Sequence, residues 1–197
     1  MAKRVFTEEE REEYREKMLT AGFDLLKKYG MTHMSIAKIT DAAGIGVSTF
    51  YNFFPSKEAY VYEVIRYRRK IIPDLMKMAL NGKEKAGPAE VRTYLKFMID
   101  ENYSTFPSLT PEDERKFLEM LPEQARPNLQ REKEIGAGFL KWMDGVRPDV
   151  NIAVAANLIK IYVLGAEGRD MLHAVVYEET MERMRDAIIY EIFGHLE

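Results

Sequence analysis

The sequence has no cysteine among its 197 residues, only three histidines and a single tryptophan. The absence of cysteine excludes a disulfide framework and thiolate metal sites, and it is typical of proteins in a reducing cytoplasm. No apolar run approaches the ~18 residues that a membrane-spanning helix needs. The opening segment, MAKRVFTEEEREEYREK, is charged and lacks an apolar core, so we expect no signal peptide and a cytoplasmic protein.

Signatures of catalysis are missing as well. The chain has no His-Glu-x-x-His zinc motif, no phosphate-binding glycine loop and no Gly-x-Ser-x-Gly nucleophile turn. His33, His173 and His195 are isolated from other ligand types, which favours surface or hydrogen-bonded histidines. We therefore expect no enzyme activity, no cofactor and no metal site.

Charge is distributed unevenly along the chain. The formal net charge of −3 does not by itself indicate a nucleic-acid partner. Between residues 17 and 57, however, five lysines stand against two acidic residues: Lys17, Lys27, Lys28, Lys38 and Lys57 against Asp24 and Asp41. This segment can therefore present a local positive surface within an acidic protein.

The stretch Ala37–Lys57, AKITDAAGIGVSTFYNFFPSK, predicts two short helices joined by a tight glycine turn. Ile39, Ala42 and Ala43 give the first helix an apolar face with small residues, which lets another helix pack close. Gly44 suits the end of this helix because glycine adopts positive φ at no steric cost. Gly46 is an acceptable N-cap for the second helix. The pattern is that of a helix-turn-helix.

The second helix, expected over Val47–Phe54, has two different faces. One side is aromatic and faces the core: Phe50, Phe53 and Phe54. The other side holds two hydroxyls, an amide and a small apolar tip, with no acidic group: Val47, Ser48, Tyr51 and Asn52. Such a face can enter a major groove. Val47 offers only methyl groups, so we expect it to read a thymine methyl.

Residues 18–58 resemble the DNA-binding domain of the TetR (tetracycline-repressor-like) family of bacterial transcriptional regulators. MLTAGFDLLKKYG is similar to the family's first helix, SIAKITDAAGIG to its second helix and turn, and VSTFYNFFPSKE to its recognition helix and the start of its fourth helix. The most specific part is the set Phe50, Tyr51, Phe54, Lys57 and Glu58. Three positions depart from the family's usual residues: Gly46, Val47 and Asn52.

The resemblance implies an all-α protein of about nine helices. A three-helix helix-turn-helix domain is expected over 1–55, and a ligand-binding and dimerisation domain over 56–197. The protein would bind a double-stranded DNA operator as a homodimer and respond to a small-molecule effector. Lys57, at a helix N-terminus after Ser56, is suited to a backbone phosphate. The expected DNA-binding residues are Ser35, Val47, Ser48, Thr49, Tyr51, Asn52 and Lys57.

Beyond residue 57, proline and glycine mark the helix boundaries. Pro73 predicts a kink or an end near Ile72 because it removes a backbone donor and clashes with the preceding turn. Pro88 suits the first turn of the next helix. Gly136 and Gly138 lie inside a later helix, where they predict either close packing or an irregular segment beside a cavity.

The last two helices carry more apolar surface than a monomer would hide. The segment Ile152–Leu164 is apolar nearly all round, which predicts burial on more than one side. The final helix repeats apolar residues at Met181, Met184, Ile188, Ile192 and Phe193. In TetR-like proteins the last two helices of each subunit form a four-helix dimer interface. We therefore expect this stripe, Ile188 included, to pack against a two-fold mate.

The middle of the chain is rich in aromatic and methionine side chains, most of which must be ordinary core. The resemblance implies a small-molecule pocket among these helices, and such a lining favours an apolar or aromatic effector. The expected ligand-binding residues are Phe97, Met98, Phe117, Phe139, Trp142 and Tyr162.

Three classes of function are compatible with the sequence. A ligand-responsive, homodimeric transcriptional repressor is the leading interpretation. The alternative is a helical adaptor that binds a protein partner through its apolar last two helices. An enzyme on a helical scaffold is disfavoured, because no acid, base or metal constellation is present.

Overall fold

The computed structural model describes residues 6–104, 111–121, 123, 126 and 128–197. These residues are predominantly α-helical and contain no β-strand apart from one isolated bridge, between Ala86 and Met143. The predicted all-α fold class is confirmed. None of the described helices is long and apolar enough to cross a membrane.

The chain divides into two compact units. Unit 1 contains the described residues of 6–70 and 111–126, and unit 2 contains those of 71–104 and 128–197. Unit 1 is therefore discontinuous in sequence, since one helix of the middle of the chain joins the N-terminal helices. The functional division expected at residue 55 stays a prediction.

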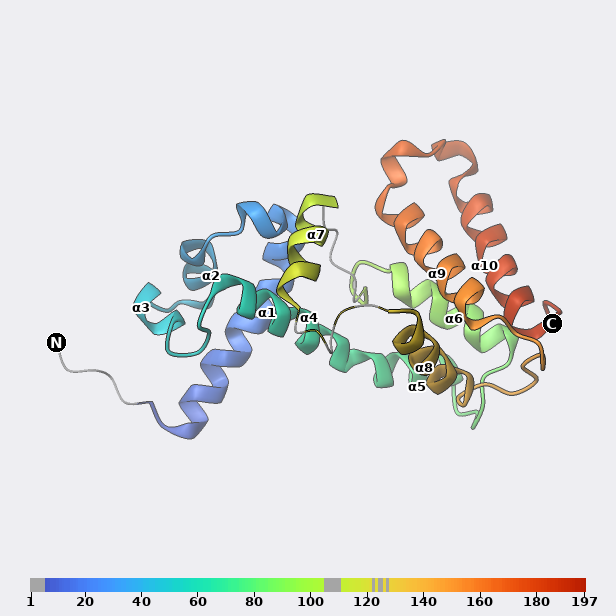
Figure 1. Cartoon of the computed structure of the whole chain (residues 1–197), viewed down its shortest axis with the longest axis horizontal. Helices are drawn as coiled ribbons and strands as arrows, with labels where there is room; N and C mark the ends of the chain where they lie inside the picture. Colours follow the sequence, from blue (N-terminus) through green and yellow to red (C-terminus); the bar gives the residue numbers. More distant parts are fainter. Residues whose placement is uncertain (1–5, 105–110, 122, 124–125, 127) are drawn as a thin grey trace. The chain divides into compact units, whose positions relative to one another are not determined.

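Unit 1 is built from α1 (Glu8–His33), α2 (Ile36–Ala43), α3 (Val47–Phe50), α4 (Lys57–Arg68) and α7 (Pro111–Met120) (Figure 1). Helix α1 packs against α2, α4 and α7, and α4 also contacts α7. The helices share one apolar core: Met18, Leu19, Phe23, Leu26, Met31, Met34, Ile39, Phe50, Phe54, Tyr60, Val61, Val64 and Ile65. The α2–turn–α3 segment is thus mounted on α1 and α4.

Helices α1 and α4 approach each other closely at Gly22. A Cβ atom there would lie 2.2 Å from the Tyr60 hydroxyl oxygen, so only glycine fits. The Tyr60 hydroxyl is buried and donates to the Met18 carbonyl at 2.7 Å, and burial raises the pKa of Tyr60. The small size of Gly22 therefore has a packing reason.

The end of α1 is interrupted at Gly30. This residue has φ 64° and ψ 174°, and helical backbone resumes after it as far as His33. The helix breaks here because the left-handed φ of Gly30 is one that glycine adopts readily. The connector from Gly30 to Met34 leads directly to Ser35, the N-cap of α2.

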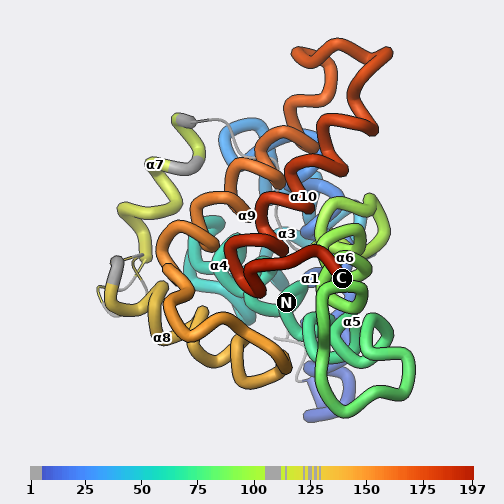
Figure 2. The backbone as a smooth tube through the Cα atoms, turned by 90° about the vertical axis from the view of Figure 1, so that its right-hand side faces the viewer, coloured from blue at the N-terminus to red at the C-terminus, as the bar shows by residue number. Residues whose placement is uncertain are grey.

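Unit 2 is built from α5 (Ile72–Leu80), α6 (Pro88–Ile99), α8 (Leu129–Leu140), α9 (Ile152–Glu167) and α10 (Tyr177–Phe193). Short 3-10 turns cover Arg69–Ile71 before α5, and Arg169–Met171 and Ala174–Val176 between α9 and α10. The break predicted near Ile72 is confirmed, since α4 ends at Arg68 and Pro73 lies in the first turn of α5. Helices α9 and α10 run side by side as a hairpin (Figure 2).

The apolar stripe of α10 lies inside unit 2, and the expectation that Ile188 faces a two-fold mate is wrong. Met181, Ile188, Ile192 and Phe193 form a core with α6 and α9, and Ile188 is 0% exposed. The apolar side chains that these two helices leave exposed are others: Val154, Ile161, Leu164 and Tyr190. The excess of apolar residues was real, but the sequence pattern did not separate the inner face from the outer one.

Gly136 in α8 marks a close approach to α9. A Cβ atom at Gly136 would lie 2.3 Å from Cγ2 of Ile152, whereas one at Gly138 would meet no described residue within 4 Å. Of the two interpretations of this glycine pair, close packing holds for Gly136.

A buried arginine joins α9 and α10. Arg185 is 5% exposed and donates to the Tyr162 hydroxyl at 2.8 Å and to the Glu182 carboxylate. Arg92 of α6 binds the same carboxylate and also Asp186 at 2.6 Å. The network satisfies the charge of Arg185 where burial would otherwise make it costly.

Candidate nucleic-acid interface

The α2–α3 turn has the geometry that its sequence predicts. Gly44 adopts φ 67° and ψ 35° at the C-cap of α2, and Gly46 is the N-cap of α3. Between them, Ile45 packs against the core of unit 1. The Ser35 side chain caps α2 by accepting the Lys38 amide at 3.3 Å. These features fix α2 and α3 as a helix-turn-helix.

Helix α3 presents the predicted polar face. Val47 and Tyr51 are 49% and 55% exposed, and Ser48 and Asn52 are also exposed, whereas Thr49 is half-buried. Phe50 and Phe54 are buried on the opposite side. The α-helix itself is shorter than the expected Val47–Phe54: it ends at Phe50, and a tighter turn follows in which Asn52 N–H donates to the Thr49 carbonyl.

Arg11 of α1 contacts the turn that follows α3. Its guanidinium donates to the Asn52 carbonyl at 3.0 Å and lies 5.1 Å from the centre of the Phe53 ring. The two partners are 41 residues apart, and no local sequence pattern joins them, so this contact could not be predicted from the sequence.

Two lysines bind carbonyl groups of the connector between α1 and α2. Lys57 donates from its ammonium to the Met31 carbonyl at 2.9 Å. Lys38 donates to the His33 carbonyl at 3.0 Å and lies 4.4 Å from the centre of the Tyr29 ring. The predicted phosphate ligand Lys57 therefore has a fixed protein partner, and Lys38 adds positive charge at the N-terminal end of α2.

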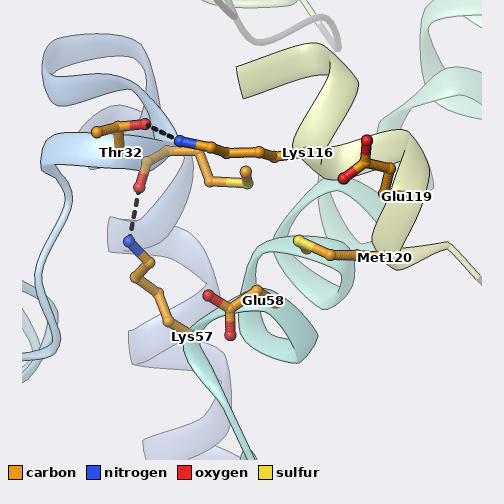
Figure 3. A pocket seen from close by; sticks show the side chains of 7 residues that line it. Thr32, Lys57, Glu58, Lys116, Glu119 and Met120 are labelled. Atoms are coloured by element: carbon orange, nitrogen blue, oxygen red, sulfur yellow. Dashed lines mark hydrogen bonds between the residues drawn. The ribbon is translucent and has the colours of Figure 1, made fainter. Parts of the chain in front are cut away.

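Helix α7 closes this region from another side. Asp113 is 2% exposed, and its carboxylate accepts the Met31 amide at 2.9 Å and the Thr32 hydroxyl. Lys116 reaches Thr32 at 3.5 Å (Figure 3). A cavity of about 460 Å³ lies beside these contacts, lined by Met31, Thr32, Lys57, Glu58, Lys116, Glu119 and Met120.

Four of the six expected ligand-binding residues come together in unit 2. Phe97, Met98, Phe139 and Trp142 pack around a small core of Leu75, Ala79 and Tyr94. The Trp142 ring meets Tyr94 edge-on at 5.6 Å, and burial raises the pKa of Tyr94 to about 12. The Trp142 backbone is fixed by its carbonyl, which accepts the Ala86 amide at 3.0 Å. We call the following seven residues the aromatic cluster: Leu75, Ala79, Tyr94, Phe97, Met98, Phe139 and Trp142.

The Trp142 indole is an unsatisfied donor. Its Nε1–H is buried and has no hydrogen-bond partner among the residues that the structure describes. Such a group normally has a partner, since leaving it unpaired costs about 1–3 kcal/mol.

The other two expected ligand-binding residues lie elsewhere. Tyr162 is fully buried in the α6–α9–α10 core, where its hydroxyl accepts from Arg185. Phe117 belongs to unit 1, where it packs against the core together with Met120. Phe117 and Met120 are three positions apart on α7 and therefore share one helix face. This face packs against the core of unit 1.

No group of three or more potential metal-binding side chains occurs within the described ranges.

The family comparison identifies the segment that contains this interface. Residues 18–64 match the family described as bacterial regulatory proteins, tetR family. The match covers α2, α3 and most of α1 and α4, so the resemblance drawn from the sequence is confirmed. No curated protein matches the chain.

Solved structures similar to this chain extend over nearly its whole length. The TetR-family transcriptional regulator of Cytophaga hutchinsonii has a TM-score of 0.62 at 15% identity, covering 98% of this chain and 100% of its own. A structure reported for the control of antibiotic production by bacterial hormones has a TM-score of 0.63 at 17% identity, covering 90% and 96%. FadR of Bacillus subtilis in complex with stearoyl-CoA has a TM-score of 0.51 at 15% identity, covering 86% and 96%. At these identities the likeness establishes the fold.

Proposed function

Because residues 18–64 form a helix-turn-helix domain of the TetR family of bacterial regulatory proteins, we propose that the protein is a cytoplasmic transcriptional repressor that binds DNA and has no enzymatic activity. The observation that carries this proposal is the face of α3. Val47, Ser48, Tyr51 and Asn52 are exposed, while Phe50 and Phe54 anchor the same segment in the core. A rigid, exposed face without acidic groups is what readout of base edges in a major groove requires.

We further propose that two copies bind a palindromic operator. The support is the apolar surface that α9 and α10 leave exposed, where Ile161, Leu164 and Tyr190 are 54%, 62% and 57% exposed. One recognition helix reads only a half-site, so a two-fold dimer matches two half-sites about one helical turn, ~34 Å, apart.

The proposed effector is a small apolar or aromatic molecule that carries a hydrogen-bond acceptor. Its proposed site is the aromatic cluster, with Trp142 donating its unpaired indole N–H to that acceptor. Apolar walls with one well-placed polar group are typical of small-molecule sites. FadR of B. subtilis, similar in fold, binds stearoyl-CoA, which also has a long apolar part.

The test is an electrophoretic mobility shift with DNA from just upstream of the protein's own gene. We expect a shifted complex that weakens steeply with salt, because phosphate contacts release counterions. Tyr51→Ala should weaken it, whereas Met78→Ala should not; Met78 is a comparably exposed residue on α5.

The same experiment separates the repressor from the adaptor. Absence of any salt-dependent affinity for DNA, with Tyr51→Ala indistinguishable from the unmodified protein, would contradict the proposal. Binding of a protein partner that Leu164→Asp removes would then favour the adaptor.

A further inference from the structure

Asp113 of α7 and Lys57 of α4 hold the same residue, Met31, from opposite ends of its backbone. The Asp113 carboxylate accepts the Met31 amide at 2.9 Å, and the Met31 carbonyl accepts the Lys57 ammonium at 2.9 Å. We propose that Asp113 is a positioning residue for DNA binding: acting through Met31, it fixes the Lys57 ammonium where that group binds a backbone phosphate. The inference rests on the proposed DNA-binding function.

The contact between Asp113 and Met31 depends on features of both α7 and the end of α1. The carboxylate is 2% exposed, and it accepts a second hydrogen bond from the Thr32 hydroxyl, as a buried carboxylate requires. The approach also needs a glycine. A Cβ atom on Gly30 would lie 2.7 Å from Oδ2 of Asp113, and Gly30 already has the positive φ that a side chain would resist.

The helix that carries Asp113 is itself fixed to unit 1. Phe117 and Met120, one and two turns further along α7, pack against the core that supports α2, α3 and α4. Contacts at both ends of the helix therefore hold the carboxylate in place. A functional group is precise only when the residues that support it are also held.

Lys57 has hydrogen-bond donors left over for a phosphate, and its flexible side chain must be held in place to use them. A lysine ammonium has three donors, so binding the Met31 carbonyl leaves two for a phosphate. Its four-carbon chain is among the side chains that lose most rotamer freedom on being fixed. The Lys57 side chain borders the 460 Å³ cavity, which gives the side chain room to turn away if the Met31 carbonyl moves (Figure 3). Holding the ammonium beforehand removes that cost from the binding step.

The test is a double-mutant cycle on full-length protein, measuring affinity for the upstream duplex at several salt concentrations by fluorescence anisotropy. Lys57→Ala should lower the magnitude of the log–log salt slope by about one unit, which is about a fivefold weaker affinity at 0.15 M salt. Asp113→Ala should reproduce most of that change. The double variant should then be no worse than Lys57→Ala alone, because both act on one phosphate contact.

Two further variants serve as controls. Glu112→Ala removes the same charge from the same helix, but Glu112 is an exposed side chain paired with Lys116, so the salt slope should not change. Asp113→Asn keeps one acceptor for the Met31 amide, and its slope should lie between those of the unmodified protein and Asp113→Ala. It also serves as the test variant if Asp113→Ala fails to fold.

The salt slope separates positioning from a loss of structure. A variant that merely unfolds has fewer active molecules but makes the same phosphate contacts, so its slope is unchanged. An unchanged slope for both Asp113 variants, or losses that add in the double variant, would overturn the inference while leaving the repressor intact. An unchanged slope for Lys57→Ala would overturn the phosphate contact and the inference together. Failure of the unmodified protein to bind any duplex would overturn the proposed function itself.

Discussion

At the scale of single residues, the composition of the α3 face limits what it can read. Val47 is exposed at the start of the helix and presents only methyl groups. A methyl group recognises apolar surface in the major groove, and only thymine provides it there. The hydroxyls of Ser48 and Tyr51, by contrast, can donate to or accept from either bases or phosphates.

Val47→Ala should therefore cost on the order of 1 kcal/mol at one position of each half-site and little at the others. The measurement is the affinity of both proteins for a series of duplexes in which each half-site base pair is changed in turn. A uniform loss over all positions would argue that Val47 packs the helix without reading a base.

A second residue-scale feature is the carboxylate that neutralises Arg185. The hydrogen bond from Arg185 is the main reason that the pKa of Glu182 lies below its usual value of 4.5. A group whose pKa is lowered by folding stabilises the native state above its unfolded pKa and loses that effect as the pH falls. The contribution of Glu182 should be complete near neutral pH and be lost progressively as the pH falls from about 4.5 through the lowered pKa of the folded state.

Glu182→Gln should lower the free energy of unfolding at pH 7 by about 1–3 kcal/mol, because it leaves the buried guanidinium poorly paired. Urea titrations at pH 7 and pH 4 should show the difference from the unmodified protein shrinking at the lower pH. Glu178→Gln, on the same helix at an exposed position, is the control. Equal effects of the two substitutions would show that the network adds nothing to stability.

At the scale of helices, α9 and α10 have an inner face and an outer face, and a charge introduced on one should have a different effect from a charge introduced on the other. Leu164→Asp places a charge on the outer face and should shift the protein toward monomer in sedimentation without lowering its melting temperature. Ile188→Asp places the same charge in the core of unit 2 and should destabilise the protomer itself. The first variant should lose operator binding, since a monomer reads one half-site. If the Leu164→Asp variant still sedimented as a dimer, the dimer interface would lie somewhere other than the outer face of α9 and α10.

The helical elements also show which features the sequence could predict. Gly44 and Pro73 act through backbone geometry that their own chemistry determines, so the turn at Gly44 and the helix break near Pro73 could be predicted from the sequence. The exposed face of α3 followed from the spacing of its phenylalanines.

Long-range partners were beyond the reach of the same rules. Periodicity states which face of a helix is apolar, but not what covers it. The sequence pattern therefore could not show that Ile188 packs inside unit 2 or that Phe117 packs against the core of unit 1. The contact between Asp113 and Met31 spans 82 residues, and no local pattern announces it. The Lys57–Met31 bond was missed for the same reason, although Lys57 itself was singled out.

At the scale of the whole molecule, the proposed effector and operator must influence each other equally. If an effector lowers the affinity for DNA by some factor, DNA lowers the affinity for that effector by the same factor, commonly about 5- to 150-fold. Trp142 is the single tryptophan of the chain and lies in the aromatic cluster, so its fluorescence reports on the proposed site.

We expect titration with an aromatic or lipophilic compound to change Trp142 emission over the same concentrations that change DNA affinity. The midpoint should move by the same factor when operator is present. A compound that quenches Trp142 but leaves DNA affinity unchanged would be filling space only. Compounds that all release DNA while Trp142 stays silent would exclude the aromatic cluster as the effector site.

The discontinuity of unit 1 has a consequence for the order in which the protein is made. Synthesis proceeds from the N-terminus, so α1 to α4 leave the ribosome well before α7, which starts at Pro111. At the usual ~5–20 residues per second, this gap lasts several seconds. During that time the Met31 amide lacks its carboxylate partner, and Phe117 and Met120 do not yet cover the core. A nascent chain therefore carries a complete recognition helix before it carries the residues that steady its surroundings.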